Sequence, residues 1–216
     1  MNVLAVGAHH DDIELGCGGT LARLARDGHR TFGLTLTNSA TRYESRGIIR
    51  TSEEARSEAQ QAAGVLGLTL IELEGCEHDN GTLVYDVDLM RRIEHFIDEQ
   101  RISLVFSHWS HDLNTDHEAA AKTTIVAARR VPSLLMYRSN WYQPGQPFDG
   151  KFFVDISETI EQKRRSLECF HSEIKNRTRD WLESFFDSHR TAGFAAGRKY
   201  AEVFEPQRYE LFPRLK

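Results

Sequence analysis

Residues 2–12, NVLAVGAHHDD, join a short apolar run to four consecutive side chains that are able to bind a metal or transfer a proton. An apolar run such as 2–8 is typical of a strand buried on both faces of a parallel sheet. The glycine-rich segment 16–20, GCGGT, then opens a stretch with apolar residues at helical spacing. A strand that leads through a polar loop into a helix indicates an α/β fold, in which ligands bind beyond the carboxyl ends of the strands.

The same alternation of strands and helices continues along the chain. We expect further strands at 29–37, 68–73, 102–106, 133–137 and 151–156, the last of these being the final strand. We expect the other helices at 52–66, around 89–97, and at 116–130, 157–171 and 178–190, with a polar loop at 38–50. This order predicts a three-layer, Rossmann-like α/β fold with a mostly parallel sheet and helices on both faces. Because no repeat or linker interrupts the pattern, residues 1–216 are expected to form a single domain.

The composition argues against several classes of protein. The 216 residues are 40% hydrophobic, enough for a sizeable core, and the net charge of −5, with both signs interspersed, argues against a nucleic-acid-binding protein. No apolar run approaches the ~18–20 residues that span a membrane, and no signal segment precedes the first strand, so membrane insertion is not expected. The cysteines at 17, 76 and 169 form no C-x-x-C pair, which favours a reduced, cytoplasmic protein.

A second cluster of polar side chains follows the strand expected at 102–106. It reads SHWSHDLNTDH over residues 107–117. Because the carboxyl ends of parallel strands meet at one edge of a sheet, we expect it to lie close to the HHDD cluster. On their own, such His and Asp residues are commonly loop or cap residues, but two clusters at two strand ends favour a functional site.

The two clusters together offer the ligands of a catalytic metal. Such a site takes three His or carboxylate ligands and leaves one position for water, and His9, Asp12 and His117 supply that set. A mixed shell of this kind suits zinc and iron(II) about equally. Asp11 would then be free to accept a proton from the water that the metal activates.

Residues 8–20, AHHDDIELGCGGT, resemble the AHPDD(x)E-type signature of the PIG-L/LmbE-like metal-dependent N-deacetylases. These include N-acetylglucosaminyl-phosphatidylinositol deacetylases and the deacetylases of the mycothiol and bacillithiol pathways. Residues 112–117, DLNTDH, are similar to the second motif of the family, and further similar segments lie at 57–67, 78–83, 154–163 and 197–204. The matches occur in the family's order along most of the chain.

The resemblance implies a function and a mechanism. The expected reaction is hydrolysis of an N-acetyl amide on a small amino-sugar conjugate, with His9, Asp12 and His117 as metal ligands and Asp11 as general base and acid. Zinc is the first choice of metal, with Fe2+ or another divalent ion as an alternative. Relatives often form trimers or hexamers, so a homo-oligomer is expected.

The chain departs from the family pattern at three places. Asn114 stands where many relatives have a His that would stabilise the oxyanion, so His111 or His108 are alternatives for that role, and Asp116 is expected to orient this helper or a ligand. His10 stands where relatives usually have Pro, and we interpret it as a surface residue or as an additional polar contact. Residues 192–193, AG, stand where relatives often have Arg-Gly.

Three residues are candidates for substrate binding. By resemblance, Asp79 is expected to hydrogen-bond a sugar hydroxyl, although it also suits an ordinary turn. Arg50, in the polar loop, is suited to an acidic or hydroxylated substrate group or to an ion pair. Trp109 is suited to stacking on a sugar, with core packing as the alternative.

Other functions compete with a sugar deacetylase. The nearest is an amidase that acts on a non-sugar N-acyl compound with the same metal site. A catalytically silent metal- or sugar-binding module is the second, because Asn114 and His10 depart from the common pattern. A nucleotide-binding module is disfavoured, since the glycines at 16, 18 and 19 lack the G-x-G-x-x-G spacing.

Overall fold

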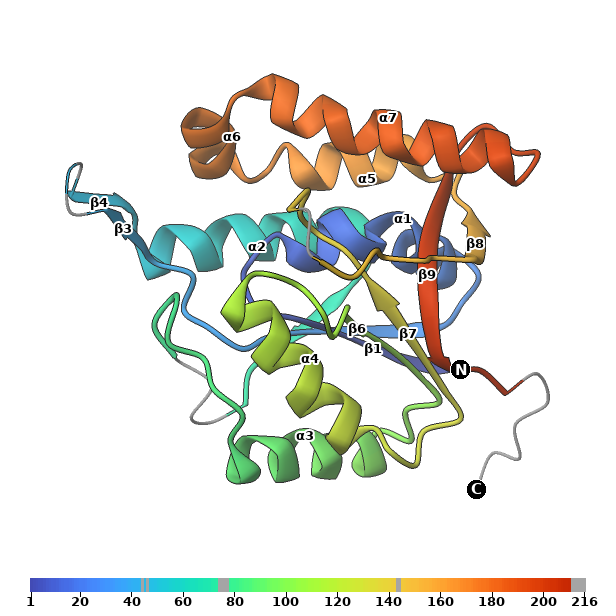
Figure 1. Cartoon of the computed structure of the whole chain (residues 1–216), viewed down its shortest axis with the longest axis horizontal. Coiled ribbons are helices and arrows are strands. Elements are labelled where there is room, and N and C mark those ends of the chain that lie inside the picture. Colours follow the sequence, from blue (N-terminus) through green and yellow to red (C-terminus); the bar gives the residue numbers. More distant parts are fainter. Residues whose placement is uncertain (44, 46, 74–77, 143–144, 211–216) are drawn as a thin grey trace.

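The computed structural model describes residues 1–43, 45, 47–73, 78–142 and 145–210. The predicted loop residues 75–77, with Cys76, therefore lie outside the described residues. Its main sheet has seven strands in the order β5-β2-β1-β6-β7-β9-β8 (Figure 1). Five of them run parallel: β1 (Asn2–Gly7), β2 (Arg30–Thr35), β5 (Thr69–Ile71), β6 (Leu104–His108) and β7 (Ser133–Tyr137). The predicted three-layer α/β fold is confirmed.

Helices cover both faces of this sheet (Figure 1). One face packs against α3 (Val87–Glu99) and α4 (Thr115–Ala127), and the other against α1 (Asp12–Arg26) and α2 (Ser52–Leu66). A further layer on the α1 side is formed by α5 (Ile160–Leu167), α6 (His171–Arg177) and α7 (Arg179–Ala195). Within β1, Leu4 and Val6 face α3 and α4 while Val3 and Ala5 face α1, as expected for a strand buried on both faces.

The helix α2 begins and ends as expected for the predicted range 52–66. The Thr51 side chain accepts a hydrogen bond from the Glu54 backbone N–H at 3.1 Å, and Gly67 ends the helix with a φ of 72°. Within the described part of the chain, no helix is both long and apolar enough to cross a membrane.

Two sequence predictions about the sheet are wrong. The segment 38–50 is not only a polar loop, because β3 (Thr41–Tyr43) and β4 (Gly47–Arg50) pair as an antiparallel hairpin that projects from the domain. The segment 151–156 does contain β8 (Phe152–Asp155), but it is not the last strand. That strand is β9 (Ala201–Arg208), which inserts antiparallel between β7 and β8. Its two acidic residues, Glu202 and Glu205, concealed it, because they make the segment look exposed although Glu202 is buried in an ion pair.

Candidate metal centre and active site

The loop between β1 and α1 carries the HHDD cluster. Asp11 is the N-cap residue of α1 and has a φ of 139°, a backbone conformation that residues other than glycine rarely adopt. The backbone N–H of His9 donates to Asp12 Oδ2 at 2.7 Å, so the loop closes on its own carboxylate. Strained backbone of this kind concentrates at functional sites, where the surrounding structure holds it in place.

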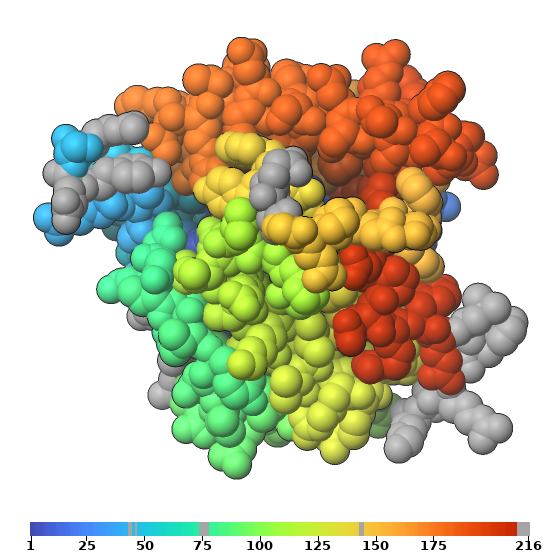
Figure 2. Space-filling view, in the orientation of Figure 1, coloured from blue at the N-terminus to red at the C-terminus, as the bar shows by residue number. Residues whose placement is uncertain are grey.

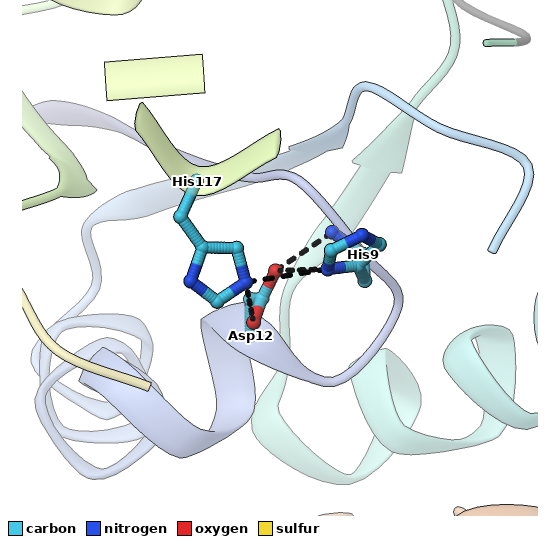
Figure 3. A group of neighbouring side chains, drawn as sticks. All are labelled: His9, Asp12 and His117. Carbon is cyan, nitrogen blue, oxygen red and sulfur yellow. Dashed lines mark hydrogen bonds and ion pairs between the residues drawn. The ribbon is translucent and has the colours of Figure 1, made fainter. Parts of the chain in front are cut away.

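Three side chains from the two predicted clusters converge beyond the ends of β1 and β6 (Figure 3). The distances are 3.3 Å from His9 Nδ1 to Asp12 Oδ2, 3.3 Å from His117 Nε2 to Asp12 Oδ1, and 3.3 Å from His117 Nε2 to His9 Nδ1. A metal bound tetrahedrally at about 2.0–2.1 Å would separate its ligand atoms by about 3.3–3.4 Å. The set therefore fits a divalent metal in both chemistry and spacing.

A second group of potential ligands shares His117 with the first. His108, Asp112 and His117 lie together and are all buried. However, Asp112 Oδ2 lies 3.1 Å from Nδ1 of His117, the ring nitrogen that does not face His9. His108 Nε2 accepts from the backbone N–H of Ala8 at 3.0 Å. The second group therefore supports the first, because it orients a ligand and has its own partners.

Each ligand of the first set is held by an outer partner. His9 Nε2 lies 2.9 Å from Asp116 Oδ2, and Asp116 also accepts from the backbone N–H groups of Gly81 and Leu83, at 2.6 and 3.0 Å. The Ser139 hydroxyl donates to Asp12 Oδ1 at 2.8 Å. Such contacts fix ring orientation and ligand basicity, so the site is organised before a metal binds.

The two adjacent carboxylates are in different electrostatic states. Burial, together with the charges of Glu173 and Asp12, raises the pKa of Asp11 to about 7. Burial also opposes ionisation of Asp12, but the positive charge of His117, its hydrogen bond and the adjacent His108 ring hold the pKa of Asp12 well below its ordinary value. Asp12 is thus an anion suited to a cation, and Asp11 is a base suited to neutral pH.

The imidazoles respond to the same carboxylates. Burial alone would lower the pKa of His9, but hydrogen bonds to Asp116 and Asp12 raise it to about 10. Burial likewise opposes protonation of His117, whereas Asp12 and Asp112 raise its pKa to about 9. The residues around the site thus favour positive charge at this position, as a cation site requires.

The three ligands open into a pocket of about 190 Å3. Asp11 and Asn114 line it beside the ligands, and the C-terminal part of the chain contributes Tyr142, Glu173 and Arg177. A substrate carbonyl in this pocket would lie beside both the candidate metal ligands and Asp11. The arrangement suits hydrolysis of a small amide or ester.

The family model described as PIG-L, GlcNAc-PI de-N-acetylase, matches residues 4–128, which is more than half of the chain. The chain belongs to the PIG-L family. A curated relative, the uncharacterized deacetylase YaiS of Escherichia coli, is 36% identical over 74% of this chain and 83% of its own. The family and this relative support a deacetylase, a class of hydrolase.

Solved structures show the same fold. N,N'-diacetylchitobiose deacetylase from Pyrococcus horikoshii has a TM-score of 0.76 and 18% identity, and covers 98% of this chain and 86% of its own. The 4-carboxy-2-hydroxymuconate hydratase GalB from Pseudomonas putida also has a TM-score of 0.76, with 21% identity, and covers 100% and 98%. At these identities the likeness concerns the fold alone.

Two of the residues predicted for catalysis lie beside the candidate metal centre. Asp116 contacts His9, consistent with the positioning role expected for it. Asn114 lines the pocket, and its Oδ1 accepts from the backbone N–H groups of Asp116 and His117, at 2.9 and 3.3 Å. Asn114 therefore caps α4 and positions the helix that carries a ligand.

Two other predicted residues lie outside the pocket. His111 is exposed, and its ring packs edge-on against Trp109. Trp109 is fully buried in the core between the sheet and α4, where it also contacts Phe148. The predicted stacking of Trp109 on a sugar is therefore replaced by its alternative, core packing, because no face of the indole is accessible.

The remaining predicted substrate-binding residues, Arg50 and Asp79, lie on or beside the β3–β4 hairpin. Arg50 lines the pocket, but it is buried and lies 3.1 Å from Glu173 and 3.3 Å from Glu58. Asp79 is exposed in the groove next to the pocket, where it accepts from Asn38 at 2.7 Å. His10 does not line the pocket. Burial, followed by the charge of Arg50, lowers its pKa to about 4.

No local sequence pattern indicated the C-terminal side of the pocket. Tyr142, Glu173 and Arg177 belong to no metal-binding motif and lie outside the family-matched residues 4–128. Ser139 lies two residues after the end of β7, so the rule that ligands gather at the carboxyl ends of strands was the one available indication. Glu173 and Arg177 reach the site only because α6 packs against α2 and β4, which a local pattern does not reveal.

Proposed function

We propose that the protein is a zinc-dependent N-deacetylase that hydrolyses the N-acetyl amide of a small amino-sugar conjugate. The triangle of His9, Asp12 and His117 beside Asp11 is the observation that carries this proposal. Family membership supports the deacetylase chemistry, and the likeness to a structure described as a diacetylchitobiose deacetylase supports an amino sugar. Two imidazoles and one carboxylate support zinc, with Fe2+ as the alternative.

The residues of the pocket suit the proposed reaction. A divalent cation held by His9, Asp12 and His117 would polarise the amide carbonyl and make a water molecule more acidic. Asp11, with a pKa of about 7, accepts the proton of the attacking water and then donates it to the departing amine. Asn114 keeps its amide N–H groups free of described partners, so it can donate one to the oxyanion that develops at the carbonyl.

The size and lining of the pocket limit the substrate. A cavity of about 190 Å3 is smaller than the usual ~300–1,000 Å3 of small-molecule sites, so it holds only one small ring with its acetyl group. Asp79, exposed in the groove next to the pocket, lies where it can bind a hydroxyl group at the edge of that ring, whereas the guanidinium of Arg50 is held by Glu58 and Glu173. A conjugate would extend beyond this pocket.

We further propose a domain organisation, an oligomeric state and a cellular location for the protein. We expect one domain over residues 1–216 and a cytoplasmic homo-oligomer, a trimer or hexamer by resemblance to the family, without nucleic acid as a partner. The thiols of Cys17 and Cys169 are free, as a reducing compartment requires.

Assays with and without metal test the proposal. Purified protein is stripped with a chelator, reloaded with zinc or iron(II), and offered N-acetylated sugars and non-sugar N-acyl compounds, with release of free amine as the measurement. We expect amine from the sugars only after a metal is restored. Release from non-sugar amides alone would instead establish the amidase. A protein that binds one metal per chain yet releases no amine would be a binding module. Addition of water to an unsaturated acid would favour the hydratase chemistry of the GalB structure.

A further inference from the structure

A second cavity of about 470 Å3 lies behind one wall of the metal pocket. The wall is the segment 138–142 that follows β7. Ser139 and Tyr142 line the metal pocket, Arg138 and Trp141 line the second cavity, and Asn140 lines both. Figure 2 shows the residues after β7, in yellow, between α4 in green and the C-terminal helices in orange. The volume lies within the usual ~300–1,000 Å3 of small-molecule sites.

One polar atom beside this cavity lacks a protein partner. His189 of α7 lines the cavity and is 8% exposed. Its imidazole hydrogen-bonds the backbone of Ala201, while Nε2 has no partner among the described residues. Burial lowers the pKa of His189 well below its ordinary value, so the ring is neutral and Nε2 is an acceptor. A hydroxyl donor from a ligand would satisfy this atom.

The other lining residues indicate what kind of molecule would fit. Trp141, Phe148 and Phe185 contribute aromatic surfaces, which suit the apolar face of a ring. Ser184 and Ser188 donate their hydroxyl protons to carbonyl groups of their own helix, which leaves their oxygens as acceptors.

The charge of the lining residues indicates that the ligand of this cavity is neutral. Arg138 is the one charged residue that lines this cavity among the described residues, and it donates to the backbone carbonyls of Asn140 and Tyr142. Acceptors at the edge and aromatic surfaces at the faces match a ring that carries hydroxyl groups.

We propose that this cavity is a second carbohydrate site, which binds a neutral hydroxylated ring next to the metal pocket. The ring is either the unit joined to the N-acetylated sugar or a separate sugar. Only the first of these rests on the proposed function. A ring bound in this cavity would also affect the orientation of His117. Asn140, which lines the cavity, donates to Asp112 at 2.7 Å, and Asp112 orients His117.

A blocking substitution tests the cavity. Ala192 lines it from α7, so Ala192→Arg would place a long side chain inside, whereas Thr191→Arg, one residue earlier and exposed, is the matched control. Cellobiose, which carries no acetyl group, is the binding probe and is titrated by calorimetry into zinc-loaded protein. His189→Phe, which removes the acceptor, is the second variant, and thermal unfolding verifies that each variant is folded.

The two sources of the ring give different results. If the ring is joined to the substrate, Ala192→Arg should raise the ratio of the KM of N,N'-diacetylchitobiose to that of N-acetylglucosamine about tenfold. If the ring is a separate sugar, Ala192→Arg should abolish cellobiose binding and leave this ratio unchanged. Thr191→Arg should change neither quantity. The inference fails if folded Ala192→Arg and His189→Phe proteins match the wild type in both measurements. Failure of the wild type to deacetylate either sugar would count against the proposed function alone, because the cellobiose titration does not depend on it.

Discussion

Two buried clusters of charge in this molecule have opposite characters. Lys163 and Glu202 are both fully buried, with Nζ 2.6 Å from Oε1. Glu202 also accepts from the backbone N–H groups of Gly19 and Thr20, and Lys163 also donates to the carbonyl of Leu15. Each charged group of this pair is satisfied by protein atoms, and neither Lys163 nor Glu202 lines the metal pocket, the second cavity or the groove that holds Asp79.

The candidate metal centre has the opposite character, because it contains a buried carboxylate without a partner in the described part of the chain. Asp11 is buried and lines a pocket, yet its carboxylate has no hydrogen bond within the described residues, and its backbone has a positive φ. Asp12 next to it adds a like charge that raises its pKa further. A buried cluster that is fully paired holds elements together, whereas one with an unpaired, strained carboxylate is arranged for a ligand.

The largest expected effect is on the unpaired carboxylate. Asp11→Asn keeps the shape of the side chain but removes the base, so kcat/KM should fall by about 10²–10⁴, equivalent to about 2.7–5.4 kcal/mol. The metal content, measured by atomic absorption, should stay near that of the wild type. Asp27→Asn, at the exposed end of α1, is the control. Activity above a tenth of the wild-type value would show that Asp11 is not the base.

Disruption of the buried Lys163–Glu202 pair should lower the stability of the fold. Lys163→Met leaves the Glu202 carboxylate buried without its cation, which should lower the free energy of unfolding by about 3–5 kcal/mol. Urea denaturation of the metal-free protein measures this. The double variant Lys163→Met/Glu202→Gln should recover much of the loss, because the amide oxygen still accepts from α1 while the buried charge is gone. An additive loss would mean that the pair matters through packing.

A substitution at Asp116 should have an intermediate effect, because this residue is both paired and in contact with a candidate metal ligand. This carboxylate is fully paired like Glu202, but one of its partners is the ligand His9. Asp116→Asn should weaken metal affinity about 10–100-fold, because the partner of the His9 ring is lost. Competition with a chromophoric chelator measures the affinity. Glu118→Gln, an exposed change on the same helical turn, should leave it unchanged. Equal affinities would show that Asp116 only braces the backbone.

The sequence was sufficient to predict which side chains of the candidate metal centre would lie together where local patterns specify them. HHDD follows an apolar strand, and His117 follows another, so the rule for strand ends in parallel sheets was enough to bring them together. It was not sufficient for parts that depend on distant contacts. Arg50 resembles a free loop cation until α6 supplies Glu173, and Trp109 resembles a site residue until its burial is known. The strand β9 was missed because Glu202 looks exposed when Lys163 is not considered.

The smallest expected effect tests whether burial is what makes the paired cluster strong. Arg26 of α1 and Glu158, two residues before α5, form an ion pair at 2.6 Å between side chains that are 47% and 77% exposed. This pair joins α1 to the start of α5, just as Lys163 joins the two helices through the Leu15 carbonyl. Because water solvates and screens both charges, Arg26→Met should lower the free energy of unfolding by no more than about 1 kcal/mol, and the loss should shrink at high salt. Urea denaturation at low and high salt, alongside Lys163→Met, measures both. Similar losses for the two variants would mean that the connection between α1 and α5, and not the burial of charge, sets the stability of this region.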